Sequence, residues 1–331
     1  RLVALFHLAA QDTLRVAFNF RPQLSRGDKD MSRWIRRLAY ALGTLVLLIA
    51  VLAGFVVMKS NSMLTKKYNP PNEPLTVASD PTALARGAHL VTVISKCTEC
   101  HGDNLAGKIF IDDPALGHVI ASNLTRGKGG VGDKYTDAQM AVTNRHGIKI
   151  DSTSALVMPA DDFQVFSDED VAAVVAYVRS MPPVDNELPK STLGPLGRAL
   201  SVAGQLPIYV AEAVPVDRPH VATIARDTSL AYGSYLANAG GCTGCHGPTL
   251  SGGKIPGTPP EWPPAANLTP SGIGHYTDAQ IREILHSGKR PNGSPVNDVM
   301  PWRYTTKMTD DETTATIKYL RSVPAKEFGG R

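Results

Sequence analysis

The stretch "CTECHG" at residues 97–102 decides the fold, and a near copy, "CTGCHG", recurs at residues 242–247. All four cysteines of the 331-residue chain lie in these two motifs. No cysteine is therefore left for a disulfide, a thiolate nucleophile or a separate metal site. Enzyme classes that depend on such a cysteine are excluded.

Cys-x-x-Cys-His is the attachment motif of c-type haem. Two thiols add to the vinyl groups of the porphyrin, and the histidine after the second cysteine binds the iron. The sequence thus predicts two covalently bound c-type haems. The haem-binding candidates are Cys97, Cys100 and His101 in the first copy, and Cys242, Cys245 and His246 in the second.

Two other readings of the motif are possible. A structural zinc site pairs two Cys-x-x-Cys knuckles about 15–20 residues apart, whereas 141 residues separate these two. A thioredoxin-like redox site needs a βαβ context, and strand signals are scarce in this chain. Both alternatives are less consistent with the repeated histidine than haem is.

The motif belongs to a longer internal repeat. Matching segments follow one another in the same order, each recurring 141–146 residues later: "LARGAHLV" and "LAYGSYLA", "ASNLT" and "AANLT", "YTDAQ" and "YTDAQ", "VMP" and "VMP". The chain therefore contains one module of about 100 residues twice. Each module reads as three helices joined by long loops rich in glycine and proline.

Capping signals mark where these helices begin. Asp80-Pro81 precedes the first helix. Thr136 with Gln139, and Thr277 with Gln280, predict capping boxes on the middle helices. The last helices are expected to begin at Ser167 and Thr309, and both end before a proline.

The second axial ligand of each iron is expected to be a methionine. Met158 and Met300 occupy matched positions in the two "VMP" segments, and the proline would stiffen the loop that presents the sulfur. Met140, Met181 and Met308 have no methionine at the matching position and are read as packing residues. Asn123 and Asn267 of the repeated "NLT" are candidates for hydrogen bonds to a haem propionate.

An apolar segment precedes the repeat. Residues 38–58 carry no charge over 21 positions, which at 1.5 Å per residue spans ~31 Å, enough to cross a bilayer. Arg33, Arg36 and Arg37 precede it, so the positive-inside tendency leaves the N-terminus cytoplasmic and exports the rest. We interpret the segment as an uncleaved anchor, with a cleaved signal peptide as the alternative.

Charge is concentrated at the N-terminal end. Residues 1–37 hold eight Lys or Arg against three Asp, within a net charge of +4 for the whole chain. The basic balance therefore gives no reason to expect nucleic-acid binding by the main body. Because Met31 directly precedes the basic stretch, a further hypothesis is that the natural product starts there and lacks residues 1–30.

With these motifs, the chain resembles the class I cytochrome c family, present as two tandem domains. The segments "LARGAHLV", "ASNLT" and "YTDAQ" are similar to the haem subunits of membrane-bound alcohol and gluconate dehydrogenases, which carry three such modules where this chain has two. The resemblance implies a helical bundle around each haem. It also implies that the first and last helices cross at a glycine packed on an aromatic residue, Gly87 on Tyr177 and Gly233 on Tyr319.

The expected fold is all-α, with two tandem cytochrome c-type helical domains and long loops after one transmembrane helix. The expected parts, in chain order, are a cytoplasmic tail (1–37), the anchor (38–58), a linker (59–79), domain 1 (80–183), a second linker (184–224) and domain 2 (225–331). The second linker is expected to contain a short amphipathic helix that packs over one domain.

The leading functional hypothesis is electron transfer without catalysis. Histidine and methionine would close both faces of each iron, and methionine raises the potential. A membrane-anchored di-haem cytochrome would carry electrons from a respiratory or dehydrogenase donor to a terminal oxidase or soluble carrier. The expected location is the bacterial inner membrane, with the haem domains on the periplasmic side.

Two alternatives stay open. The chain is the electron-accepting subunit of a membrane-bound alcohol, gluconate or aldehyde dehydrogenase complex, or it is a di-haem peroxidase. A peroxidase needs one iron that opens a coordination site, and the matched methionines argue against this. Thiosulfate-oxidising di-haem enzymes use a cysteine ligand, and this chain has no spare cysteine.

Overall fold

The structure is a computed structural model that describes residues 26–259 and 261–330, with side chains from residue 31. Helix α2 (Arg26–Thr65) contains the whole predicted anchor. Its part Met31–Thr65 is long and apolar enough to cross a membrane, and its most apolar stretch is not buried in the protein. The predicted tail and the hypothesis of a start at Met31 both concern residues 1–30. Of these, residues 1–25 lie outside the described part.

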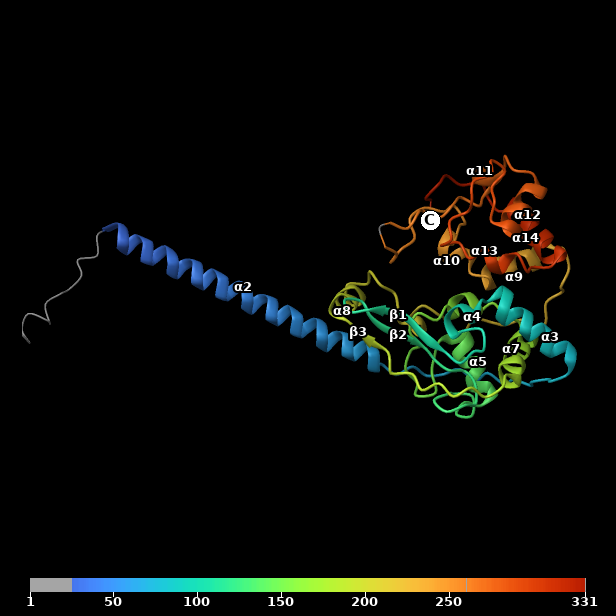
Figure 1. The fold of residues 1–331 in the computed structure, drawn as a ribbon, viewed down its shortest axis with the longest axis horizontal. Helices are drawn as coiled ribbons and strands as arrows, with labels where there is room; N and C mark the ends of the chain where they lie inside the picture. The colour runs from blue at the N-terminus through green and yellow to red at the C-terminus, as the bar shows by residue number, and fades with distance from the viewer. Residues whose placement is uncertain (1–25, 260, 331) are drawn as a thin grey trace, which may run out of the picture. The chain divides into compact units, whose positions relative to one another are not determined.

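The chain divides into two units, residues 1–55 and residues 56–331. The second unit contains both copies of the repeat, which we call module 1 (residues 80–183) and module 2 (residues 225–331). Figure 1 shows the helices of module 1 in teal to green and those of module 2 in orange to red.

The helices of module 1 are α3 (Pro81–His89), η1 (Leu90–Ile94), α4 (Cys97–His101), α5 (Asp137–His146), α6 (Ala160–Phe163) and α7 (Asp168–Ser180). Those of module 2 are α9 (Leu230–Ala239), α10 (Cys242–His246), α11 (Pro270–Ile273), α12 (Asp278–Ser287), α13 (Trp302–Thr305) and α14 (Asp310–Ser322). Five helices correspond in order, namely α3, α4, α5, α6 and α7 with α9, α10, α12, α13 and α14, as the repeat predicts. Among the described residues, η1 is found in module 1 and α11 in module 2.

Side-chain caps begin the helices where the sequence predicts them. Complete capping boxes join Thr136 with Gln139 at α5 and Thr277 with Gln280 at α12. Asp80 caps α3 by accepting from two backbone N–H groups. Because each cap satisfies donors that a helix end leaves unpaired, these residues set the helix boundaries locally.

The first and last helices of each module cross at a glycine, as the resemblance implies. A Cβ on Gly87 would lie 2.0 Å from the carbonyl oxygen of Ala173 and 2.7 Å from Cβ of Tyr177. A Cβ on Gly233 would lie 2.0 Å from the Ala315 oxygen and 2.8 Å from Cβ of Tyr319. Only glycine allows the two helices to approach this closely.

We expect Gly233→Ala to destabilise module 2, because the added methyl group has no room between α9 and α14. Overpacking of this kind costs about 1–3 kcal/mol, which lowers the melting temperature by roughly 4–8 °C per kcal/mol in a domain of this size. Thermal unfolding checks this, with Ser234→Ala on the same helix as the control. Equal melting temperatures for the two variants would contradict the close crossing.

Module 1 has one residue more than module 2 between the crossing glycine and the first cysteine. The structure accommodates it in η1, a π-helix in which the Ser95 N–H donates to the Leu90 carbonyl at 2.8 Å. A π-helix takes up an inserted residue without moving the residues that flank it. The crossing glycine and the Cys-x-x-Cys-His motif therefore keep their relation in both modules.

The expected all-α fold is incomplete, because module 1 also carries a hairpin. Strands β1 (Lys108–Asp113) and β2 (Gly117–Ala121) pair antiparallel, and β3 (Thr192–Leu193) adds to β2. The Asp113 carboxylate caps the turn by accepting from the N–H groups of Ala115 and Leu116. Module 2 has prolines in the matching loop, "KIPGTPPEWPP", and proline cannot donate to a ladder.

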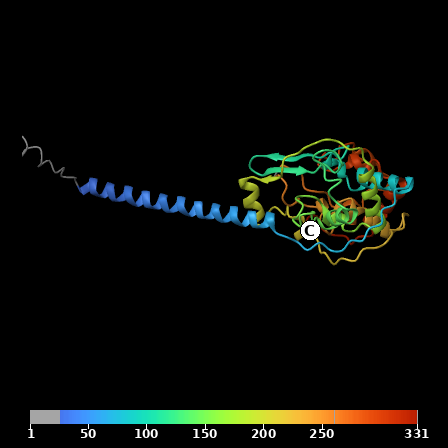
Figure 2. The ribbon, with the colours of Figure 1, turned by 90° about the horizontal axis from the view of Figure 1, so that it is seen from below.

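The linker between the modules contains α8 (Pro195–Val202), which confirms the predicted short helix. It lies against the hairpin of module 1, where a Cβ on Gly197 would be 2.0 Å from the Leu116 oxygen. Figure 2 shows the hairpin and α8 side by side. The linker continues into η2 (Val210–Glu212), which also packs on module 1.

The two modules meet through residues at equivalent places in the repeat. His89 of α3 binds Glu312 of α14, with Nε2 2.8 Å from Oε2. Tyr235 of α9, which matches His89, donates to Asp170 of α7 over 2.5 Å. Asp170 in turn matches Glu312. The contact is therefore pseudo-twofold symmetric, like the interface of a symmetric dimer.

Arg86 joins the two carboxylates of this contact. It donates to both oxygens of Asp170 at 2.8 and 2.7 Å and lies 3.6 Å from Glu312. Both acids are buried, and a buried carboxylate without a partner is costly. The two modules also share an apolar core, which includes Phe166 and Leu236. This core and the Arg86 network together hold the modules in one arrangement.

Candidate functional site

Each Cys-x-x-Cys-His motif forms one short helix, α4 or α10. The residue before each helix has a left-handed backbone, Lys96 with φ 53° and Gly241 with φ 70°. A glycine follows each helix with φ 78° and 82°. The backbone repeats along with the sequence, and each turn of helix carries two cysteines and one histidine together.

The motif histidines are oriented by backbone carbonyls. His101 Nδ1 lies 2.7 Å from the Ser122 oxygen, and His246 Nδ1 lies 2.7 Å from the Ala266 oxygen. Because a carbonyl only accepts, Nδ1 carries the proton and Nε2 carries the lone pair that binds a metal. Burial lowers the pKa of His101, which keeps the ring neutral as a ligand must be.

The motif cysteines are not activated as thiolates. No disulfide joins any of the four. Burial raises the pKa of Cys97 to about 12 and that of Cys100 to about 11, and it also raises the pKa of Cys242. Reactive thiolates show the opposite shift. The environment therefore disagrees with a thioredoxin-like site and is compatible with thiols that are consumed in thioether bonds.

The matched methionines stand at identical turns. The Ala160 N–H donates to the Met158 carbonyl at 2.8 Å, and the Trp302 N–H donates to the Met300 carbonyl at 2.8 Å. The proline between has φ −80° and ψ 61° in module 1 and φ −78° and ψ 49° in module 2, which is an inverse γ-turn. Both methionines are partly buried.

The methionine loop of module 1 is held from outside the module. Val157 has φ 64°, a backbone conformation that a β-branched residue rarely adopts. Its N–H donates to the Ile208 carbonyl of the linker at 3.0 Å. Met63 and Leu64, at the end of α2, pack in the same apolar cluster as Val157. The linker and the end of α2 thus fix the segment that carries Met158.

These residues fit a covalently bound haem. In module 1, Cys97 and Met158 both border the same apolar core cluster, so the attachment point and the candidate sulfur ligand share one apolar environment. In module 2, Cys242 borders the corresponding cluster. Met140, Met181 and Met308 also border the module 1 cluster, and only the repeat distinguishes Met158 from them.

Asn123 and Asn267, the candidates for contact with a propionate, make matching hydrogen bonds within the protein. The Asn123 amide donates to Val184 O at 2.8 Å, and its oxygen accepts from the backbone and side chain of Thr125. Asn267 makes the same contacts with Lys326 and Thr269. Each asparagine therefore ties its loop to the segment that follows the last helix of its module.

A separate group of potential metal ligands within the described residues consists of Glu73, His146 and His220. His146 Nε2 lies 2.7 Å from Glu73 Oε1, and Arg145 donates to Glu73 Oε2 at 2.7 Å. The Arg145 guanidinium already supplies the positive charge that neutralises Glu73. The group is therefore an ion-pair cluster that fastens both linkers to module 1.

The sequence predicts the motif residues, and the two methionine ligands stay a prediction. It does not point to the groups that orient the motif histidines. The carbonyls of Ser122 and Ala266, which orient the motif histidines, belong to the residues directly before the repeated "NLT". Lys96 carried no sequence signal for its left-handed backbone.

Comparison with known proteins agrees with this site. The family model described as cytochrome c matches the chain twice, at residues 84–182 and 230–324. The fructose dehydrogenase cytochrome subunit of Gluconobacter japonicus is 29% identical over 286 residues, which are 79% of this chain and 57% of the relative.

Two further relatives have similar names. The cytochrome c subunit of the quinone-dependent alcohol dehydrogenase of Gluconobacter oxydans is 29% identical, over 75% of this chain and 56% of the relative. The gluconate 2-dehydrogenase cytochrome c subunit of Pantoea cypripedii is 28% identical, over 74% of this chain and 60% of the relative. The chain thus spans a little over half the length of the curated relatives it matches.

Proposed function

Because the chain belongs to the cytochrome c family, with one family domain in each module, we propose that it is a membrane-anchored di-haem electron carrier. It serves as the electron-accepting cytochrome subunit of a dehydrogenase complex. The observation that carries the proposal is the duplicated site, in which two Cys-x-x-Cys-His helices and two Met-Pro turns recur with the same backbone geometry.

In this proposal Cys97, Cys100, Cys242 and Cys245 hold the two haems, and each haem supplies a one-electron couple. His101 with Met158, and His246 with Met300, would hold the irons. Methionine ligation favours a high potential, and two protein ligands per iron leave no position for substrate. The chain therefore passes electrons and leaves catalysis to another subunit.

The proposed layout has α2 in a bacterial inner membrane and both modules on the periplasmic side. The support is the apolar length of Met31–Thr65 and the arginines Arg33, Arg36 and Arg37 before it. Domain limits of 80–183 and 225–331 complete the layout. The acceptor is a terminal oxidase or a soluble carrier.

Subunit function is supported by the relatives, each of which is named as the cytochrome subunit of a dehydrogenase. We expect the chain, tagged at its C-terminus and purified from detergent-solubilised native membranes, to bring down a catalytic subunit with a flavin or quinone cofactor. The mass of the co-purified chains and reduction of the haems by its substrate check this. A preparation that contains both haems and no such partner would leave a free electron carrier and refute the subunit role.

A further inference from the structure

The segments after the two methionines lie across the module boundary. Helix α6 follows Met158, and helix α13 follows Met300. Asp162 is the fourth residue after Met158, and Tyr304 is the fourth residue after Met300, so the two occupy the same place in the repeat. Each reaches the attachment helix of the other module.

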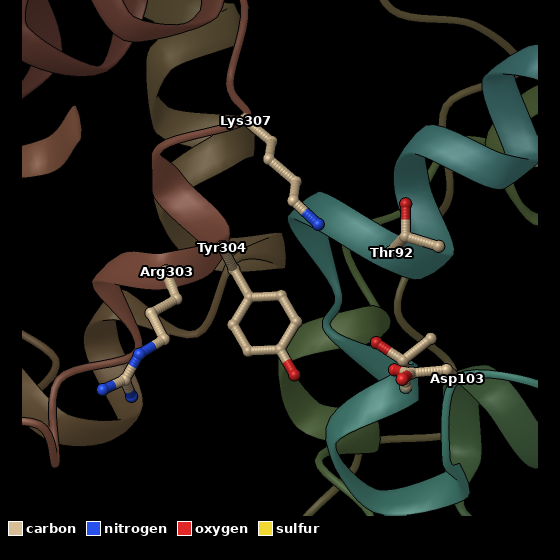
Figure 3. Close-up of a pocket in the computed structure, with 6 residues that line it drawn as sticks. Thr92, Asp103, Arg303, Tyr304 and Lys307 are labelled. Carbon is tan, nitrogen blue, oxygen red and sulfur yellow. The ribbon is translucent and has the colours of Figure 1, made fainter. Parts of the chain in front are cut away.

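Tyr304 reaches α4 of module 1. Tyr304 and Thr98, which stands between the two cysteines, line the same cavity. The ring borders this cavity of about 280 Å³ between the modules, lined by Thr92, Thr98 and Asp103 from module 1 and by Arg303, Tyr304 and Lys307 from module 2. Figure 3 shows Tyr304 of α13 and Lys307, which follows this helix, extending towards Thr92 and Asp103.

Asp162 reaches the attachment helix of module 2. A Cβ on Gly241 would lie 2.8 Å from its Oδ2, and a Cβ on Gly244 would lie 3.8 Å from it. The charge of Asp162 acts on Cys242 of that helix. Module 1 has Lys96 and Glu99 at the places of these two glycines, so only the motif of module 2 leaves room for a carboxylate beside it.

The charges at the two matching contacts differ. Beside α4, Asp103 lines the cavity together with the cations Arg303 and Lys307, and Arg303 also pairs with Asp298 at 3.0 Å. Beside α10, Asp161 and Asp162 are opposed by one cation, Lys96, whose Nζ donates to the Gly240 carbonyl at 2.5 Å. A net negative charge therefore lies at the edge where module 2 attaches its haem.

We propose that Asp162 of module 1 lowers the redox potential of the haem of module 2, and so makes the two duplicated modules unequal. The inference rests on the proposed function. A carboxylate close to a haem stabilises the oxidised iron, which carries one positive charge more than the reduced iron. Module 1 has the uncharged Tyr304 at the matching contact, so its haem lacks this effect.

The ionisation of Asp162 supports the assignment. Burial raises its pKa to about 7, with Asp161 adding to the shift and Lys96 opposing it. The potential of module 2 should therefore fall as pH rises through about 7, because loss of the proton adds negative charge. Asp161 and Lys96 are the charged groups that face Asp162.

The test is a redox titration of the full chain carrying Asp162→Asn, with Asp161→Asn as the matched control. Asp161 has the same charge one residue away but is exposed to solvent, so its field is screened. We expect Asp162→Asn to raise the equilibrium constant for reducing module 2 about tenfold, or ~59 mV for one electron. The control should shift it by less than half as much, and the pH dependence near 7 should disappear in Asp162→Asn alone.

Both variants are also titrated in a Met158→His background, which moves the wave of module 1 away from that of module 2. An unchanged module 2 wave in Asp162→Asn, or equal shifts in both variants, overturns the inference while the proposed function stands. Fewer than two haems on the unsubstituted chain overturns the proposed function itself, and the inference with it.

Discussion

We expect the double variant Cys97→Ala/Cys100→Ala to carry one haem per chain instead of two, and to lose the fold of module 1. Cys97 lies at the border of the core cluster that Met158 also borders, so loss of the haem leaves an apolar cavity there. Large cavities in a core cost several kcal/mol, about 24 cal/mol per Å³ in the best-studied series. Haem content by the pyridine assay and limited proteolysis of the purified chain check this.

The matched variant Cys242→Ala/Cys245→Ala distinguishes the effect of haem loss in module 2 from its effect in module 1. It removes the haem from the smaller cluster of module 2, whereas the shared core lies mainly in module 1. We therefore expect module 1 to stay folded in Cys242→Ala/Cys245→Ala. In Cys97→Ala/Cys100→Ala we expect module 2 to be disturbed as well as module 1. Thr98→Ser, which leaves both cysteines in place, serves as the control. Two haems in either double variant would contradict the attachment sites.

Replacing Met158 or Met300 by histidine should lower the potential of one haem at a time. Methionine raises the potential of iron relative to a second nitrogen ligand. Because axial ligands span about 0.8 V across haem proteins, we expect a fall of ~0.1 V or more. The weak far-red absorption band of sulfur bound to ferric iron should be halved in each variant and absent in the double variant.

Met140→Leu and Met181→Leu are the controls for these two variants. Both methionines border the core of module 1, as Met158 does, but neither has a methionine at the matching place in module 2. They should leave the potentials and the far-red band unchanged. If Met140→Leu abolished half of the band and Met158→His did not, the ligand assignment from the repeat would be wrong.

Local features of the fold were predictable from the sequence. The capping boxes at Thr136 and Thr277 form as predicted, because a cap depends on residues within one turn of helix. The crossing at Gly87 and Gly233 followed from the resemblance, since the family uses one small residue there. The repeat supplied an internal comparison, which separated Met158 and Met300 from the other methionines.

Features that depend on contacts far apart in the sequence were missed. The hairpin of β1 and β2 forms in module 1, whereas the matching loop of module 2 contains prolines. The repeat therefore did not predict the hairpin. The contact of His89 with Glu312 joins residues 223 positions apart. Asp162 and Tyr304 occupy the same place in the repeat but are different residues. The repeat marks positions where the residues are alike, so it does not mark this pair.

The central claim is that each module attaches one haem through its own two cysteines. Proteolysis of the mature chain and mass measurement of the two peptides that contain residues 97–101 and 242–246 test it directly, wherever the natural chain begins. The account predicts that each peptide is heavier by the mass of one haem. Two unmodified peptides, or a zinc ion and no porphyrin in the intact protein, would contradict it.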